Sequence, residues 1–474
     1  MASLNDSLTI GRSGVLTHQE RLAIISHNIA NVNTPGYHRQ TAVLGTNPPN
    51  QPGLYSSRAY ELGTGVRVLD VTRAYNEMRE AVYLSQNSAS AMHSQLASAL
   101  PDLQALVNSN GDASLSTCLR DFWAAWQDVS NNPDSLTMRN VLLERAGTLT
   151  ERFNIVSARL DEYRTAIARD AGGTPEGALP DAVAEVNSLA TRIQNLNARI
   201  QVASGTGINA NDLEDQRNLL IRELSGKVNI TVAADKTITI DTRVLVSGDG
   251  VTRNDLTVTG TDPIELTLDG VVISVTGGEV AGWTQLAAIT DSLGTGIDTM
   301  ADELSTQINL LHTAGYDLNA TLGVDFFTGA GAAGITVNSA LYNPANPLLN
   351  QPRLIAAAAT IYGPGMPNTG DGAMALAIAD LSQVRLPALG DQTLADYFTG
   401  VVGTLAASIN SEEDLTADGQ AVLDTLNNAI QGETGVSLDE EMIDMLACQR
   451  AYQASARLVT TIDEMLDTLI NQMA

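Results

Sequence analysis

The stretch that decides the fold lies at the amino terminus, where residues 4–37 read LNDSLTIGRSGVLTHQERLAIISHNIANVNTPGY. One row of residues in this stretch, which we call its seam, recurs in alternating steps of four and three residues. This is the spacing of a coiled coil sustained for about four heptads. Gly11 and His18 are the two weak points of this seam. Pro35 and Gly36 end the predicted helix, because proline disfavours helical geometry in the preceding residue and glycine suits a left-handed turn. The seam consists of Leu4, Leu8, Gly11, Val15, His18, Leu22, Ile25, Ile29 and Val32.

The carboxyl-terminal residues carry a second seam of the same kind. Two three-residue steps follow each other at Ala456, Val459 and Ile462, a stammer that locally overwinds a coiled coil. Neither terminal helix has an apolar partner close in sequence. We therefore expect the two helices to pair with each other, which places both chain ends at one pole of an elongated molecule. The second seam consists of Leu438, Met442, Met445, Gln449, Tyr452, Ala456, Val459, Ile462, Leu466, Leu469 and Met473.

The middle of the chain is mainly helical with one β insertion. Helical periodicity holds from about residue 76 to 226, changes at Val228 to the period of two that strands show, and returns near Thr284. Residues 45–64 and 329–370 are rich in glycine, proline and asparagine, and we expect them to be an extended connector and an irregular segment. The fold class is therefore mainly α with a β insertion, in an elongated multidomain chain. We expect a terminal coiled-coil domain of residues 1–45 plus 434–474, a helical-bundle domain of residues 46–227 plus 284–433, and an inserted β-domain of residues 228–283.

The composition limits the class of partner. The 474 residues contain 26 Lys+Arg and 54 Asp+Glu, which gives a net charge of −28. A surface with this much negative charge repels phosphates and anionic lipids. Nucleic acids and membrane surfaces are therefore poor candidates for partners. The sequence has no apolar run long enough to cross a bilayer and no cleavable secretory signal, and we expect no membrane insertion. The two cysteines, Cys118 and Cys448, form no CxxC pair, so neither a zinc site nor a disulfide framework is predicted.

Motifs that would indicate catalysis or metal binding are missing or incomplete. The sequence has no HExxH, GxSxG, Walker A or dinucleotide-binding pattern. Asp317, Asn319 and Thr321 have the spacing of a calcium loop, but the glycine comes one position late and the bidentate glutamate is missing, so a structural turn is the better interpretation. The many carboxylates offer no distinct glycosidase pair, although sequence alone does not exclude one. We predict no catalytic residue, no metal site and no cofactor.

The residues that end the first helix carry a recognisable motif. The stretch HNIANVNTPGY at residues 27–37 resembles the N-terminal motif of the bacterial flagellar rod, hook and hook-associated axial family. The stretches EEM at 440–442, QRAYQASA at 449–456 and DEML at 463–466 resemble the other terminal helix of that family. Three internal stretches, at 215–220, 309–319 and 323–327, are similar to its hook-associated members. The motif residues are Asn28, Ala30, Asn31, Thr34, Pro35, Gly36 and Tyr37.

The resemblance implies a structural role without chemistry. It implies a subunit of a ring between the flagellar hook and filament, exported by the flagellar type III system and located outside the cell. The implied partners are further copies of the chain, the hook protein, a second junction protein and an export chaperone at the C-terminal helix. Both terminal seams would then be assembly interfaces. A hook or rod subunit of the same family is the nearest alternative, and a secreted glycan-cleaving enzyme or an adhesin on a flagellar scaffold are more distant ones.

Overall fold

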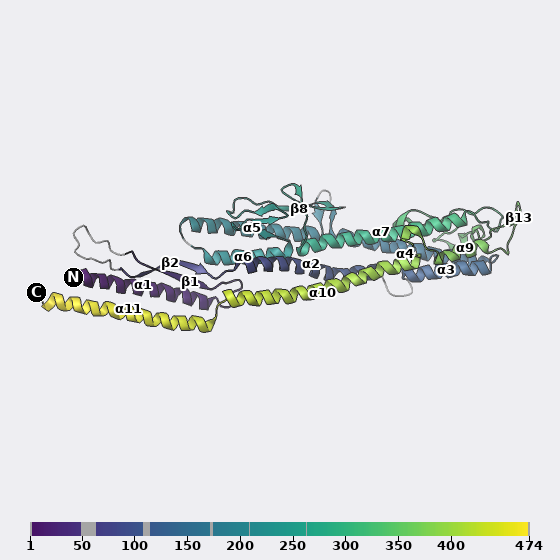
Figure 1. The fold of residues 1–474 in the computed structure, drawn as a ribbon. Coiled ribbons are helices and arrows are strands. Elements are labelled where there is room, and N and C mark those ends of the chain that lie inside the picture. The colour runs from purple at the N-terminus through teal and green to yellow at the C-terminus, as the bar shows by residue number, and fades with distance from the viewer. Residues whose placement is uncertain are drawn as a thin grey trace.

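The molecule is elongated and mainly helical, with both termini at one pole (Figure 1). The computed structural model describes residues 2–48, 63–107, 114–170, 174–207, 209–261 and 263–472. The predicted fold class is confirmed. In the described part of the chain, no helix is both long and apolar enough to cross a membrane. The helices are α1 Ala2–Ala30, α2 Glu77–Val107, α3 Leu115–Asn131, α4 Leu136–Ile167, α5 Ala178–Gly205, α6 Asn211–Lys227, α7 Gly278–His312, α8 Gly331–Gly334, α9 Ala373–Asp380, α10 Leu394–Thr434 and α11 Leu438–Gln472.

The terminal pole consists of α1, α11 and a β-hairpin whose first strand the sequence did not predict. Strand β1 (Gln40–Thr46) pairs antiparallel with β2 (Val66–Arg73). The hairpin lies along α1, where Thr17 donates a hydrogen bond to the carbonyl of Val66 over 3.0 Å. The domain boundary expected after residue 45 falls inside β1. The hairpin packs against α1 and also bonds the start of α6, where Nδ2 of Asn211 donates to the carbonyl of Val71 over 2.8 Å. The rest of the expected connector, residues 49–62, lies outside the described residues.

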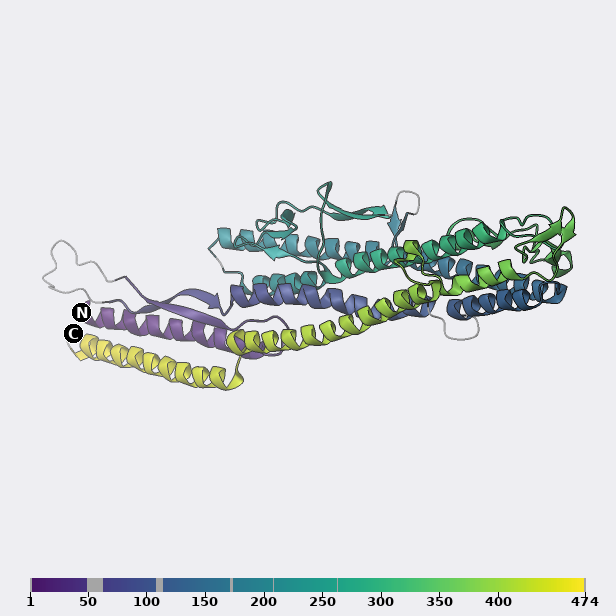
Figure 2. The ribbon, with the colours of Figure 1, turned by 45° about the vertical axis from the view of Figure 1, so that its right-hand side comes forward.

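The helical body is built on α2, which packs against α10 along much of its length and also against α6 and α7 (Figure 2). Further along, α3, α4 and α7 enclose an aromatic cluster that concentrates the few rings of this sequence. The ring of Phe326 lies 5.2 Å from that of Trp126 and 5.0 Å from that of Phe327. All three side chains are fully buried. Serine or threonine side chains cap the N-termini of α3, α4 and α10, which explains where these helices begin.

The β insertion forms two small antiparallel sheets that lie along α5 (Figure 1). The side chain of Asn187 on α5 bonds both the N–H and the carbonyl of Leu256, over 2.8 and 2.7 Å. The buried side chains of both sheets belong to one continuous core with the helices. Helix α7 begins at Gly278, inside the range expected for the insertion. The strands are β5 Thr231–Val232, β6 Ile238–Ile240 and β7 Arg243–Val246 in one sheet, and β8 Leu256–Thr261, β9 Ile264–Leu268 and β10 Val271–Val272 in the other.

The pole opposite the termini is irregular, as predicted for residues 329–370. It contains two short strand pairs and four 3-10 turns in addition to α8 and α9. Another short strand pair, β3 with β4, connects α4 to α5. The strands are β3 Arg169–Asp170, β4 Pro175–Glu176, β11 Phe327–Thr328, β12 Thr336–Val337, β13 Ile361–Gly363 and β14 Met366–Pro367, and the turns are Pro347–Leu349, Pro352–Leu354, Leu381–Gln383 and Pro387–Leu389.

A buried histidine makes the stability of this region depend on pH. The Nε2 atom of His312 accepts a hydrogen bond from the N–H of Ala356 over 2.9 Å, and Nδ1 bonds the carbonyl of Val324. Burial lowers the pKa of His312 to about 4. Between about pH 6.5 and pH 4, the imidazole of His312 is therefore protonated in the unfolded chain but not in the folded chain. The free energy of unfolding falls by roughly 3 kcal/mol as the pH drops through this window. Denaturant unfolding of the wild type and of His312→Gln at several pH values should show this loss in the wild type only.

Candidate functional site

The two terminal helices approach closely because glycines face the partner helix. A Cβ atom at Gly11 would lie 2.9 Å from Cγ2 of Val459, and one at Gly14 would lie 2.7 Å from Oγ of Ser455. The expectation that Gly11 weakens the seam is therefore wrong, because its missing side chain is what makes room for Val459. The thiol of Cys448 donates to the carbonyl of His18 over 3.2 Å. The position of His18, the other expected weak point, is therefore also used in the packing of α1 against α11. Burial lowers the pKa of His18 and raises that of Cys448, which keeps both groups uncharged at neutral pH.

Filling the space at Gly11 should separate the terminal helices. We expect Gly11→Val to weaken the packing by about 1–3 kcal/mol, because the new side chain overlaps the stiff, β-branched Val459. Hydrogen exchange of the α11 amides should accelerate accordingly. Val459→Ala in the same chain should restore part of the protection. Gly403→Val on α10 is the control, since a Cβ at that position would meet no atom within 4 Å apart from its chain neighbours and its own helix backbone. Unchanged exchange in Gly11→Val would contradict the close approach.

A hydrogen-bonded cluster holds the motif segment to both terminal helices, and we call it the clasp: Asn28, Tyr37, Arg39, Gln40 and Glu441. Asn28 is 1% exposed and lies at its centre. Its Oδ1 accepts from the hydroxyl of Tyr37 over 2.8 Å and from the N–H of Gln40 over 3.0 Å. Its Nδ2 donates to the carbonyl of Gln40 over 2.9 Å and to Oε2 of Glu441 over 3.0 Å. All four hydrogen-bonding positions of the amide are thus used, which only asparagine can supply in this geometry.

Arg39 and Glu441 make the charged part of the clasp. Nε of Arg39 donates to Oε1 of Glu441 over 2.6 Å, and its other nitrogens reach Glu440 and Asp444 over 3.0 and 3.2 Å. Glu441 is 1% exposed, whereas the side chain of Glu440 is 64% exposed. The N–H of Arg39 also donates to the carbonyl of Thr434, where α10 ends. The clasp therefore fixes the start of α11 against the end of α1.

The motif residues have different roles in the structure. Asn28 and Tyr37 reach the clasp, and Thr34 donates to Oδ1 of Asn31 within the turn itself. Gly36 has a φ of 75°, the left-handed region, and a Cβ there would lie 3.3 Å from the side chain of Leu219 on α6. The side chains of Ala30, Thr34 and Pro35 are exposed.

A second charged cluster joins the terminal pole to the helical body. Asp215 on α6 accepts from the N–H of His38 over 3.0 Å, contacts Nδ1 of His38 over 2.7 Å, and accepts from Arg73 over 2.8 Å. Arg73 also pairs with Glu214 over 2.7 Å. The sequence did not predict these partners of Asp215. His38 lies 177 residues away along the chain and Arg73 lies 142 away, so no periodicity could connect them.

The predicted seam residues are only partly covered when α1 and α11 pair. On α1, Ile25 is buried, and Leu4, Leu8, Val15, Leu22 and Ile29 are half-buried. On α11, Ile462 is buried, and Met445, Tyr452, Ala456, Val459 and Leu466 are half-buried, whereas Leu438, Met442 and Gln449 are exposed. The side chain of Leu469 lies outside the described residues.

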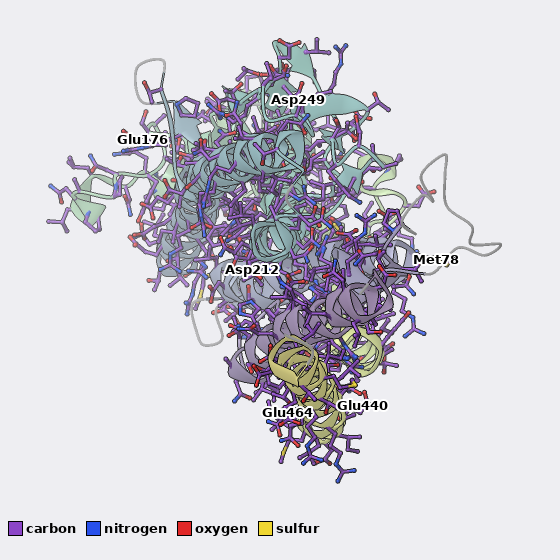
Figure 3. All side chains as sticks on the ribbon, turned by 90° about the vertical axis from the view of Figure 1, so that its left-hand side faces the viewer. Met78, Glu176, Asp212, Asp249, Glu440 and Glu464 are labelled. Atoms are coloured by element: carbon purple, nitrogen blue, oxygen red, sulfur yellow. The ribbon has the colours of Figure 1, made fainter. Side chains whose placement is uncertain are left out.

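Large apolar side chains therefore remain exposed along α11, and we call this set the α11 stripe. Figure 3 looks at the molecule from the terminal pole and shows α11, with Glu440 and Glu464 labelled, at the edge away from the β insertion. Exposed large apolar side chains gathered on one helix are typical of protein–protein contact sites. In the described ranges, no group of three or more histidine, cysteine, aspartate or glutamate side chains is arranged to hold a metal ion. The stripe consists of Leu438, Met442, Ile443, Leu446, Leu458 and Met465.

Three family models match this chain, each at a place that fits the architecture. Residues 100–327 match the flagellar hook-associated protein FlgK helical domain. Residues 432–473 match the flagellar basal body rod FlgEFG protein C-terminal model, and residues 8–38 match the flagella basal body rod protein model. The helical body is thus matched by a hook-associated model and both terminal helices by models that other axial proteins share.

Known proteins agree with these matches. Flagellar hook-associated protein 1 of Bacillus subtilis is 28% identical over 525 residues, which cover 100% of this chain and 99% of the relative. Flagellar hook-associated protein 1 of Salmonella typhimurium is 28% identical over 345 residues, which cover 67% of this chain and 58% of that relative. The solved structure of the flagellar hook junction protein FlgK from Burkholderia pseudomallei has a TM-score of 0.59 at 14% identity, over 75% of this chain and 100% of that one. It shows the shared fold. The family models and the full-length relative agree, which confirms the resemblance predicted from the terminal motifs: the chain is similar to flagellar hook-associated protein 1 over its whole length.

Proposed function

We propose that this chain is a structural subunit of the bacterial flagellum that forms the junction ring between hook and filament. The relatives that it matches are named flagellar hook-associated proteins, and the solved neighbour is named a hook junction protein. The observation that carries the proposal is the α11 stripe, which lies at the terminal pole beside the motif that resembles the axial family. Since these relatives are structural flagellar proteins, we propose no catalytic role.

The terminal pole is the part that we propose to assemble. The two seams hold α1 and α11 together, and the clasp fixes their register, so that the stripe is presented in one defined orientation. Further copies of this chain in a ring would cover the stripe, and the hook protein and a second junction protein would contact the ring from its two sides. Burial of apolar area between copies also offsets the repulsion expected between chains of charge −28.

We further propose export through the flagellar type III system with a chaperone at α11. An exposed apolar helix in a free subunit favours aggregation, and a chaperone that covers the α11 stripe would prevent it before assembly. The location that follows is the flagellum, outside the cell. We propose that the terminal helices and the β1–β2 hairpin mediate assembly, and that the helical body and the insertion support them.

Imaging of a deletion strain tests the proposed function. Cells that lack this chain should carry hooks without filaments and release filament protein into the medium, and the wild-type copy should restore filaments. Cells without hooks would instead indicate a hook or rod subunit, the alternative within the same family. Normal filaments in the deletion strain would contradict a junction role.

A further inference from the structure

A cavity between the β insertion and the helical body has no part in the assembly proposed above. Its volume is about 550 Å³, which is within the range of ligand sites. Helix α2 contributes one wall, and α6 contributes Asn218 and Ile221. Residues 229–234 and Lys236 contribute the side formed by β5. The side chains of Leu84 and Ile221 are buried and supply an apolar surface. The cavity therefore lies between a helix and the outer strand of a sheet.

The strand that lines this cavity has an unpaired edge. β5 is the outer strand of the order β5-β6-β7. The N–H of Ala233 donates to the carbonyl of Thr237 over 2.9 Å, and Val232 stands opposite Ile238. Because hydrogen-bonded and non-hydrogen-bonded pairs alternate along an antiparallel ladder, the N–H and carbonyl of Val232 point away from β6. Neither group has a partner among the described residues, so the edge is open to another strand.

Ser88, one of the residues that line the same cavity, has a buried hydroxyl without a hydrogen-bond partner among the described residues. Ser88 lies on α2 and is 4% exposed. Gly277 lies close to it, since a Cβ atom there would be 2.5 Å from Oγ of Ser88. Buried hydroxyls are nearly always bonded, because losing the bond to water is unfavourable. A bound molecule that offers a donor or acceptor at this point would satisfy the group.

We propose that the cavity binds an extended, uncharged polypeptide segment of a partner protein, which adds to β5 as a further strand. Its main chain would bond the N–H and carbonyl of Val232, as in other cases of strand addition to an open sheet edge. Alternate side chains would lie on Leu84 and Ile221, and a polar group would reach Ser88. The charges around the cavity are already balanced, because Lys236 pairs with Glu77 over 2.5 Å and Arg222 with Glu80 over 2.6 Å. A charged segment would upset this balance.

Proline at the open edge gives the decisive variant. The probe is a fluorescent, capped hexapeptide of alternating threonine and valine, which favours the extended conformation. It should bind the full chain saturably, and Val232→Pro should weaken the binding at least tenfold, because proline has no N–H. Proline is tolerated where the N–H of an edge strand faces outward, so the sheet should stay folded.

Val272→Pro is the matched control and should bind the probe as the wild type does. Val272 is 58% exposed on β10, another outer strand, and lines no part of this cavity. On β10, the N–H of Ile273 donates to the carbonyl of Leu266. Hydrogen-bonded and non-hydrogen-bonded pairs alternate along this ladder too, so the N–H of Val272 also points away from β9. Equal affinities of the two proline variants would overturn the proposal.

Two further measurements test the strand geometry separately from folding. Ser88→Ala should weaken binding of the probe at least threefold while leaving the melting temperature of the free protein unchanged or higher, since it removes an unsatisfied hydroxyl. A probe N-methylated along one edge should bind at least tenfold more weakly. Binding that survives methylation, or no saturable binding by the wild type, would show that no strand is added to β5.

Discussion

Glu441→Ala should release the start of α11 from α1 while the helical body stays folded. The carboxylate is almost fully buried and bonds both Arg39 and Asn28, so its removal leaves an amide donor and a guanidinium without their main partner. Losing one member of a buried pair typically destabilises by about 3–5 kcal/mol, and we expect the lower end because Arg39 keeps Glu440 and Asp444. Hydrogen exchange of residues 438–450 should then accelerate by roughly a hundredfold. The ring should fail to assemble, and the cells should carry hooks without filaments.

Glu440→Ala is the matched control for this prediction. Its carboxylate pairs with the same Arg39, but the side chain is 64% exposed. Exposed ion pairs contribute about 0–1 kcal/mol, so exchange and motility should stay close to the wild type. Equal effects of the two variants would mean that the burial of Glu441 is unimportant. An early melting transition of the helical body in Glu441→Ala would place the clasp in the core of the monomer.

Leu466→Asp should block assembly most strongly. Leu466 follows the stammer in the α11 seam and is half-buried when α1 and α11 pair. Truncation of a fully buried leucine destabilises by about 2–5 kcal/mol, so we expect about 2 kcal/mol or less from this half-buried one. A carboxylate in an apolar seam adds the unfavourable loss of its hydration. The residue is far from the aromatic cluster at Phe326, so the body should keep its melting transition. We expect a protein that is made and folds, but leaves hooks without filaments and releases filament protein to the medium.

Thr468→Asp controls for the added charge. Thr468 lies on the same turn of α11 but is exposed and off the seam. Cells with this variant should swim as the wild type does. Normal swimming with Leu466→Asp would show that this position meets no partner, and early melting of its helical body would show that α11 stabilises the monomer instead.

The long elements could be predicted because their signals are local. The four-and-three spacing of the first seam predicted a helix from residue 4, and the structure has α1 from Ala2 to Ala30. The change of period at Val228 predicted the insertion, and its strands begin at Thr231. Strand β1 was missed, because residues 40–46 alternate only weakly and their partner strand begins 20 residues after β1 ends.

In the candidate site, too, local features could be predicted from the sequence and long-range contacts could not. The sequence by itself determined which helices carry apolar seams, that they must find each other, and that the turn at Pro35 and Gly36 ends the first of them, since each follows from neighbours a few residues apart. Only the tertiary structure decided that Gly11 makes room for Val459, that Glu441 meets Asn28, and that Asp215 joins the terminal pole to the body. These contacts link residues more than a hundred positions apart. Their energies depend on burial and direction, which exist only once the chain has folded.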